Sequence, residues 1–178
     1  MTKSTSPFEI RRAIPAETPL LNDLTGRSVL SWGYEPEFLD WEPEAITVTS
    51  EFITNSLVFV LEDAGRIVGY YGLLGEPPEM ALDKLFVEPD RIGTGCGKQL
   101  WQHAVATTSE MGASVLTLVS DPNAAPFYAA MGAVWVREEP TSRPDWALQV
   151  FRFRLPGGAA DEDPPRAGHP SGVMATGV

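Results

Sequence analysis

A glycine-rich loop at residues 93–97 limits the folds open to this sequence more than any other segment. The loop reads Gly-Thr-Gly-Cys-Gly, and it separates an apolar run that stops at Pro89 from a helix-like stretch that ends at Gly112. A helix that begins after such a loop presents free N–H groups and a partial positive charge, which together attract a phosphate. Glycines let those amides come close to the anion. The loop therefore predicts an anion site or, as the alternative, only a tight turn between strand and helix.

Two familiar phosphate-binding loops do not fit this segment. The P-loop pattern G-x-x-x-x-G-K-[ST] would need glycine at Ile92 and Ser or Thr at Gln99, and neither is present. The dinucleotide-binding pattern G-x-G-x-x-G would need glycine at Lys98 or Leu100, and neither position has it. The loop therefore belongs to neither of these classes.

The rest of the chain predicts strands mixed with helices. Apolar, β-branched and aromatic runs predict strands at 8–13, 57–62, 66–74, 80–87, 115–119, 134–137 and 148–155. Helical spacing predicts a helical stretch that opens at Pro15, one helix after the loop and a short one at 124–131. The expected element order is β-α-α-β-β-β-α-β-α-β-β, with two helices before the hairpin. The strongest local prediction is a hairpin, because Asp63-Ala64-Gly65 joins two strand-like runs. This order predicts one α/β (α+β) domain over residues 1–156, in which helices flank a mixed central sheet of six or seven strands.

The helix after the loop is predicted to be amphipathic. Its expected inner face consists of Leu100, Ala104, Thr107, Thr108 and Met111, which recur at helical spacing.

Composition excludes several classes of protein. The 13 basic and 24 acidic residues give a formal net charge of −11, which argues against binding to a nucleic-acid backbone. One cysteine rules out a disulfide framework, and two histidines leave little material for a metal site, so no metal is predicted. No apolar run reaches the ~20 residues of a membrane helix, and the N-terminus lacks a signal-peptide core, so a cytoplasmic protein without a membrane partner is expected. Residues 157–178, rich in Gly, Pro and Ala, are expected to form a disordered tail.

Two segments that flank the predicted helix together carry a family pattern. The first is Leu85-Phe86-Val87-Glu88-Pro89 followed by the loop, and the second reads Asp121-Pro122-Asn123-Ala124-Ala125-Pro126-Phe127-Tyr128-x-x-Met131-Gly132. They resemble the GNAT superfamily of N-acetyltransferases, in which a strand ending V-x-P precedes [QR]-x-x-G-x-[GA], and N-x-x-A-x-x-F-Y-x-x-x-G-[FA] follows. When the second pattern is aligned on Phe127-Tyr128, its first position falls on Asp121, and Asn123 stands two residues later. The resemblance is strong over 82–133 and extends over 8–155. It departs at Ile92, where the family has Gln or Arg, while Arg91 stands one residue earlier.

The resemblance implies acetyl-CoA as the co-substrate. Backbone groups of Phe86 and Val87 would pair with the pantetheine arm like an added strand. The backbone amides that would bind the pyrophosphate belong to Ile92, Gly93, Thr94, Gly95, Cys96, Gly97 and Lys98. The Lys98 side chain would add a charged contact to phosphate or stay solvated. Asn123 would bond a pantetheine amide or cap the short helix.

The resemblance also implies catalytic residues. Tyr128 would lie against the cofactor near the thioester sulfur and protonate the departing thiolate. The base that takes a proton from the attacking ammonium would be Asp83, with Glu79 or water as alternatives. In a regular strand Asp83 points to the same face as Leu85 and Val87, although a bulge would change this.

Cys96 and His103 receive plainer interpretations. A cysteine at a helix N-terminus can become nucleophilic, but Cys96 is interpreted as a small loop residue that acts through its backbone. His103 has no companion at metal or triad spacing, so it is interpreted as a residue at the boundary of the apolar helix face.

The implied function is transfer of acetyl from acetyl-CoA to an amine of a small molecule or peptide, by direct attack in a ternary complex. An acyl-CoA-binding sensor with this fold and no turnover is the alternative, and a homodimer is left open. A cationic acceptor is predicted because the segment between Arg27 and Arg66 has acids but no basic residue. The motif Trp32-Gly33-Tyr34 and nearby Phe38 and Trp41 add aromatic faces suited to cations. The alternative is a solvated acidic surface over aromatic core residues. The acids are Glu35, Glu37, Asp40, Glu42, Glu44, Glu51, Glu62 and Asp63.

Overall fold

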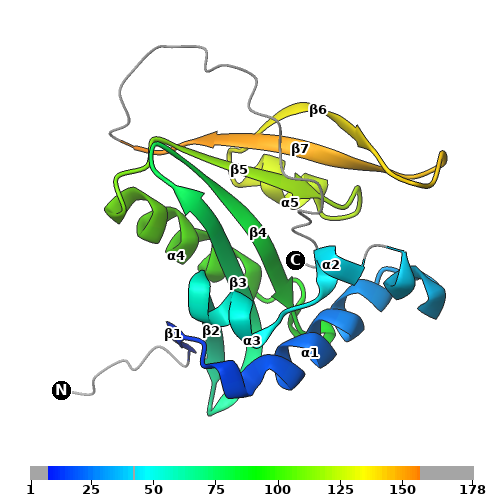
Figure 1. Cartoon of the computed structure of the whole chain (residues 1–178), viewed down its shortest axis with the longest axis horizontal. Helices are drawn as coiled ribbons and strands as arrows, with labels where there is room; N and C mark the ends of the chain where they lie inside the picture. Colours follow the sequence, from blue (N-terminus) through cyan, green and yellow to red (C-terminus); the bar gives the residue numbers. More distant parts are fainter. Residues whose placement is uncertain (1–7, 42, 157–178) are drawn as a thin grey trace.

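The computed structural model describes residues 8–41 and 43–156, so the predicted tail at 157–178 lies outside the described residues. Its centre is a seven-stranded sheet with the strand order β1-β2-β3-β4-β5-β7-β6 (Figure 1). The strands are β1 (Phe8–Arg12), β2 (Leu57–Asp63), β3 (Arg66–Glu76), β4 (Glu79–Val87), β5 (Val115–Ser120), β6 (Val134–Pro140) and β7 (Ala147–Arg154). β4 and β5 are parallel and all other neighbours are antiparallel, which confirms the predicted mixed sheet.

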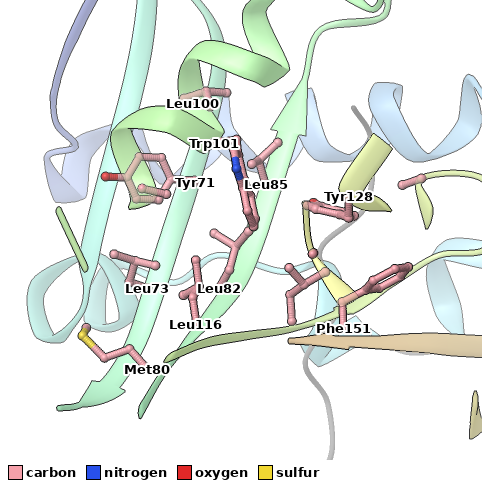
Figure 2. Close-up of a cluster of buried hydrophobic side chains, with 14 of the residues drawn as sticks. Tyr71, Leu73, Met80, Leu82, Leu85, Leu100, Trp101, Leu116, Tyr128 and Phe151 are labelled. Carbon is pink, nitrogen blue, oxygen red and sulfur yellow. The ribbon is translucent and has the colours of Figure 1, made fainter. Parts of the chain in front are cut away.

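Helices cover both faces of this sheet. They are α1 (Thr18–Leu30), α2 (Pro43–Ile46), α3 (Ser50–Asn55), α4 (Cys96–Glu110) and α5 (Ala125–Ala130), with short 3-10 turns at Pro15–Glu17, Pro36–Asp40 and Pro89–Arg91. Side chains of α1, α2 and α3 pack with Phe86 of β4 in one core. Side chains of α4 and α5 pack with Leu85 and Val87 in the other, which Figure 2 shows in close-up. β4 is thus buried on both faces, because successive residues of a strand point to opposite sides.

The predicted hairpin is present as β2 and β3. Ala64 and Gly65 form its turn with φ of 50° and 82°, and two successive positive φ values suit the right-handed twist of the flanking strands. Gly65, at the second position, adopts its positive φ without a steric penalty.

One detail of the predicted α4 face is wrong. Met111 is 48% exposed, because it lies at the C-terminal cap where the chain turns away at Gly112. Trp101, which the helical spacing did not select, is 3% exposed. Its ring lies 5.7 Å from that of Tyr128 and 5.2 Å from that of Phe153, so α5 and β7 widen the buried face of α4. None of the helices in the described ranges is long and apolar enough to cross a bilayer.

Candidate active site

β4 and β5 separate halfway along β4. They pair only over residues 79–82 and 115–118, after which β4 pairs with β3 alone and β5 with β7 alone. Figure 1 shows the two strands leaving one corner of the sheet and diverging. The backbone edge of residues 83–87 that faces β5 therefore has no strand partner among the described residues. A ligand can pair there with Phe86 and Val87, whose side chains stay in the two cores.

A β-bulge lies where the strands begin to separate. Leu73 of β3 pairs with Leu82 and Gly72 pairs with Lys84, which leaves Asp83 as the extra residue of β4. Such a bulge reorients the side chains around it.

Asp83 and Lys84 form a buried ion pair at this bulge. Asp83 Oδ2 lies 2.8 Å from Lys84 Nζ, and the two side chains are 5% and 3% exposed. The Lys84 ammonium also donates to the Ala45 carbonyl at 3.1 Å and lies 5.1 Å from the Phe52 ring, both on the side of the sheet that α2 and α3 cover. Asp83 therefore does not share the face of Val87 as it would in a regular strand, because the extra residue of the bulge shifts the alternation.

The glycine loop presents unpaired backbone donors at the start of α4. Gly93 and Gly95 have φ of +78° and +93°, values that favour glycine, and a Cβ on either would meet nothing within 4 Å. The amides of Gly93, Gly95, Cys96, Gly97 and Lys98 donate to no acceptor within residues 8–41 and 43–156. The helix also begins without a side-chain cap. Unpaired amides at a helix start form an anion site, so this geometry fits the pyrophosphate position that the resemblance implies. The amides of Ile92 and Thr94 are exceptions, because they donate to the carbonyls of Pro89 and Arg91.

Arg91 and Ile92, where the sequence departs from the family pattern, connect the loop to the rest of the fold. Arg91 Nη1 lies 2.5 Å from Asp63 Oδ2 at the β2–β3 turn. Ile92 packs against the core on the α4 side. Arg66, on the same turn, pairs with Asp90 at 3.0 Å. The loop is therefore held in place by the hairpin, a contact between residues 28 apart that no sequence pattern indicated.

Lys98 lies exposed at the rim of a pocket of about 420 Å³ between α4 and α5. The other lining residues are Trp101, Gln102, Val105, Ala130, Met131 and Phe153. One cation beside an otherwise mostly apolar wall suits a ligand that has both an anionic group and an apolar ring or chain.

Cys96 and His103 both take part in packing. The Cys96 side chain is fully buried in the core. His103 Nδ1 lies 2.8 Å from the Tyr71 hydroxyl, and burial lowers the pKa of its imidazole. Across the described residues no group of His, Cys, Asp and Glu is arranged to hold a metal ion.

Tyr128 of α5 has a buried hydroxyl without a partner. The residue is 0% exposed, and its Oη makes no hydrogen bond within the described part of the chain. Its ring packs near those of Trp101, Phe127 and Phe151, as Figure 2 shows for the first and last of these. Burial raises the pKa of Tyr128 above its ordinary value, so the phenol keeps its proton. An orphaned buried hydroxyl is rare in proteins, and the Tyr128 hydroxyl is able to bond a ligand or a water molecule.

Asn123 is exposed, and its side chain does not cap α5. The cap position is Ala124, which makes no side-chain cap bond, so the capping alternative is wrong. The Asn123 amide donates instead to the hydroxyl of Tyr34 at 2.8 Å, and its backbone N–H donates to Asp121 at 2.7 Å. Sequence reasoning missed Asp121 and the role of Tyr34, because these partners lie 87 or more residues apart.

The aromatic residues after α1 pack against one another. Tyr34 stacks on Phe38 with ring centroids 4.0 Å apart, and Phe38 is 4% exposed. The guanidinium of Arg143 lies 3.7 Å from the ring centroid of Trp41. Phe38 is therefore a core residue, and the chain itself supplies a cation to Trp41.

Comparisons with known proteins identify the family. A family model described as an acetyltransferase (GNAT) domain matches residues 38–147, which is more than half of the chain. The chain belongs to the GNAT acetyltransferase family. No curated protein matches its sequence.

Solved GNAT acetyltransferase structures share this fold at low sequence identity. The PaiA N-acetyltransferase of Thermoplasma acidophilum, in complex with coenzyme A, is 15% identical with a TM-score of 0.70, covering 83% of this chain and 99% of that one. The putative acetyltransferase yncA of Salmonella typhimurium, with acetyl-CoA, is 18% identical with a TM-score of 0.66, covering 88% and 98%. The ribosomal-protein-S18-alanine N-acetyltransferase of Escherichia coli is 17% identical with a TM-score of 0.63, covering 89% and 99%. At these identities the likeness concerns the fold alone.

Proposed function

We propose that this GNAT chain transfers the acetyl group of acetyl-CoA to a primary amine of a small molecule or peptide, by direct attack in a ternary complex. The observation that carries the proposal is the divergence of β4 from β5 beside the unpaired amides of the glycine loop. An unpaired strand edge suits the amide groups of a pantetheine arm, and the loop amides suit a pyrophosphate. Neighbours solved with acetyl-CoA or coenzyme A support the same co-substrate.

The proposed reaction uses the groups placed around this divergence. The free amine attacks the thioester carbonyl, a backbone N–H of β4 stabilises the oxyanion, and the C–S bond breaks as the amide forms. The Tyr128 hydroxyl donates its hydrogen to the leaving thiolate, whose sulfur takes the electron pair. The ammonium gives one proton to a base or to water before the attack. The second N–H proton, which the nitrogen loses as the amide forms, restores the Tyr128 hydroxyl.

Two carboxylates compete for the role of base. Asp83 lies at the bulge where the strands diverge, but it is buried against Lys84. Glu79 is 35% exposed and lies 3.7 Å from Arg152, on the part of β4 that is still paired with β5. Position favours Asp83 and accessibility favours Glu79.

We expect Asp83→Asn to lower the rate on the acidic side of the pH–rate profile, where the amine arrives as an ammonium. If Asp83→Asn has the wild-type rate and Glu79→Gln is slower, Glu79 is the base. If both variants have the wild-type rate, water takes the proton.

A cationic acceptor is the finer part of the proposal. Five acids after α1 are exposed and form no ion pair within the described residues: Glu35, Glu37, Asp40, Glu44 and Glu51. Glu62 and Asp63 are already paired with Arg11 and Arg91, so they contribute little. The unpaired acids attract cations over distances of about the Debye length, ~10 Å at 0.1 M salt.

An amine panel tests both the activity and the acceptor. Thiol release from acetyl-CoA is measured with cationic, neutral and anionic amines at low and high ionic strength. We expect release with at least one amine, the highest kcat/KM for the cationic ones, and a loss of that preference at high salt. Glu37→Gln should lower kcat/KM for cationic amines by about threefold, while Glu110→Gln, on α4, should not. Binding of acetyl-CoA without release for any amine would favour the sensor, and equal turnover of all amines at every salt concentration would remove the charge preference.

Gly95→Ala is expected to weaken acetyl-CoA binding about tenfold. A non-glycine residue at φ +93° is strained by about 1–2 kcal/mol, and relief of that strain turns the loop amides away from a common anion. Gly112→Ala is the matched control, because Gly112 ends the same helix with φ +92° and open space around its Cβ. Both variants should lose similar unfolding free energy, but only Gly95→Ala should raise the Kd in a calorimetric titration. An equal Kd for both variants would mean that the loop does not bind the cofactor.

A further inference from the structure

The hydroxyl of Tyr34 joins three segments beside the diverging strands. It donates to Asp121 Oδ2 at 2.6 Å, at the end of β5. It accepts from Asn123 Nδ2 at 2.8 Å, just before α5, and from Trp146 Nε1 at 3.2 Å, just before β7. Tyr34 itself lies between α1 and the 3-10 turn at Pro36–Asp40.

The direction of each hydrogen bond in this group is determined by its neighbours. The single hydrogen of Tyr34 goes to Oδ2 of Asp121, a residue that is 1% exposed. The indole of Trp146 only donates, so it takes one lone pair of the Tyr34 oxygen. The remaining lone pair needs a donor, which makes the Asn123 amide turn its NH₂ toward Tyr34. The carbonyl oxygen of exposed Asn123 is then the group left for a ligand.

Two further contacts hold this arrangement in place. Tyr34 is held by its stack on Phe38, and the second oxygen of Asp121 accepts the backbone N–H of Asn123 at 2.7 Å. Burial is the main cause, and the hydrogen bond to Asp121 the second, of a pKa of Tyr34 above its ordinary value. The Tyr34 hydroxyl therefore remains a donor at neutral pH.

We propose that Tyr34 is a positioning residue that sets the orientation of the Asn123 amide, so that Asn123 offers a hydrogen-bond acceptor to an N–H of the pantetheine arm. This inference rests on the proposed function, because it takes acetyl-CoA as the ligand. It also connects the segment that carries the unpaired acids to the cofactor side of the site.

Calorimetric titration of the full chain with acetyl-CoA and with ADP tests the inference. ADP carries a pyrophosphate but no pantetheine, so it reports on the loop alone. Tyr34→Phe keeps the ring on Phe38 and removes all three hydrogen bonds. We expect it to raise the Kd of acetyl-CoA about five- to tenfold and to leave the Kd of ADP unchanged. Tyr71→Phe, which removes a buried hydroxyl bonded to His103, should change neither Kd.

A double-mutant cycle separates positioning from a general loss of structure. In an Asn123→Ala background, Tyr34→Phe should cause no further loss of acetyl-CoA affinity, because Tyr34 acts through the amide that is already gone. Additive effects, or an unchanged acetyl-CoA Kd in Tyr34→Phe, overturn the inference and leave the proposed function intact. A wild-type chain that binds neither ligand overturns the proposed function itself. Should Tyr34→Phe not fold, Asp121→Asn keeps Tyr34 but allows the partner to donate, and it should weaken acetyl-CoA binding with ADP binding unchanged.

Discussion

Tyr128→Phe is expected to lower kcat by about 10²–10⁴-fold and, at the same time, to leave the fold as stable as before or more so. General acid catalysis contributes about this factor, and the substitution removes the proton donor that we propose. The ring and its packing on Trp101 are kept. The hydroxyl that is lost has no partner in the described residues, so its removal should raise the free energy of unfolding by about 1 kcal/mol. Steady-state kinetics and thermal or denaturant unfolding measure the two effects.

Tyr70→Phe is the matched control for this prediction. Tyr70 is also fully buried, but its hydroxyl lies 2.5 Å from Thr25 Oγ1. Removing a satisfied buried hydroxyl should cost about 1 kcal/mol of stability and leave kcat unchanged. If Tyr128→Phe keeps near-full kcat when the chemical step limits the rate, the proton comes from water and Tyr128 is a packing residue. The KM for acetyl-CoA should change little in either variant.

Lys84→Met is expected to lower the free energy of unfolding by about 3–5 kcal/mol. The substitution keeps the side-chain stem near the Phe52 ring but leaves the Asp83 carboxylate buried without its partner, and breaking a buried ion pair costs about this much. The double variant Asp83→Asn with Lys84→Met should lose less stability than Lys84→Met alone, since no uncompensated charge remains. Denaturant unfolding of the set measures the coupling.

An exposed ion pair provides the contrast. Arg137 lies 2.7 Å from Glu139 on β6, with 49% of its side chain exposed, so Arg137→Met should cost no more than about 1 kcal/mol. Similar losses for Lys84→Met and Arg137→Met would show that Asp83 and Lys84 are hydrated in solution. In that case the Asp83 carboxylate is accessible, which strengthens its claim to be the base. A large loss for Lys84→Met means that an Asp83→Asn kinetic defect has to be corrected for the fraction of folded enzyme.

Local patterns predicted most of the fold correctly. The hairpin at Asp63-Ala64-Gly65 was predictable because positive φ values at a two-residue turn depend on the turn residues themselves. The strand, loop and helix around residues 93–97 were predictable for the same reason, since the glycines, Pro89 and Gly112 act on the backbone next to them. The extent of the buried face of α4 was less predictable, because α5 and β7 decide whether Trp101 is covered.

The sequence by itself determined the backbone groups of the candidate site, because the first amides of a helix have no acceptor within it and a glycine before α4 supplies no side-chain cap. Only the tertiary structure decided the partners of the side chains. The sequence from Leu82 to Val87 predicts a regular strand. Its pairing with β3 places Asp83 in a bulge, where the carboxylate contacts Lys84. Arg91 contacts Asp63, 28 residues away in the sequence, and Tyr34 contacts Asp121, 87 residues away. A hydrogen bond or ion pair depends on distances of about 3 Å, which sequence separation does not contain and which only the packing of the sheet and helices establishes.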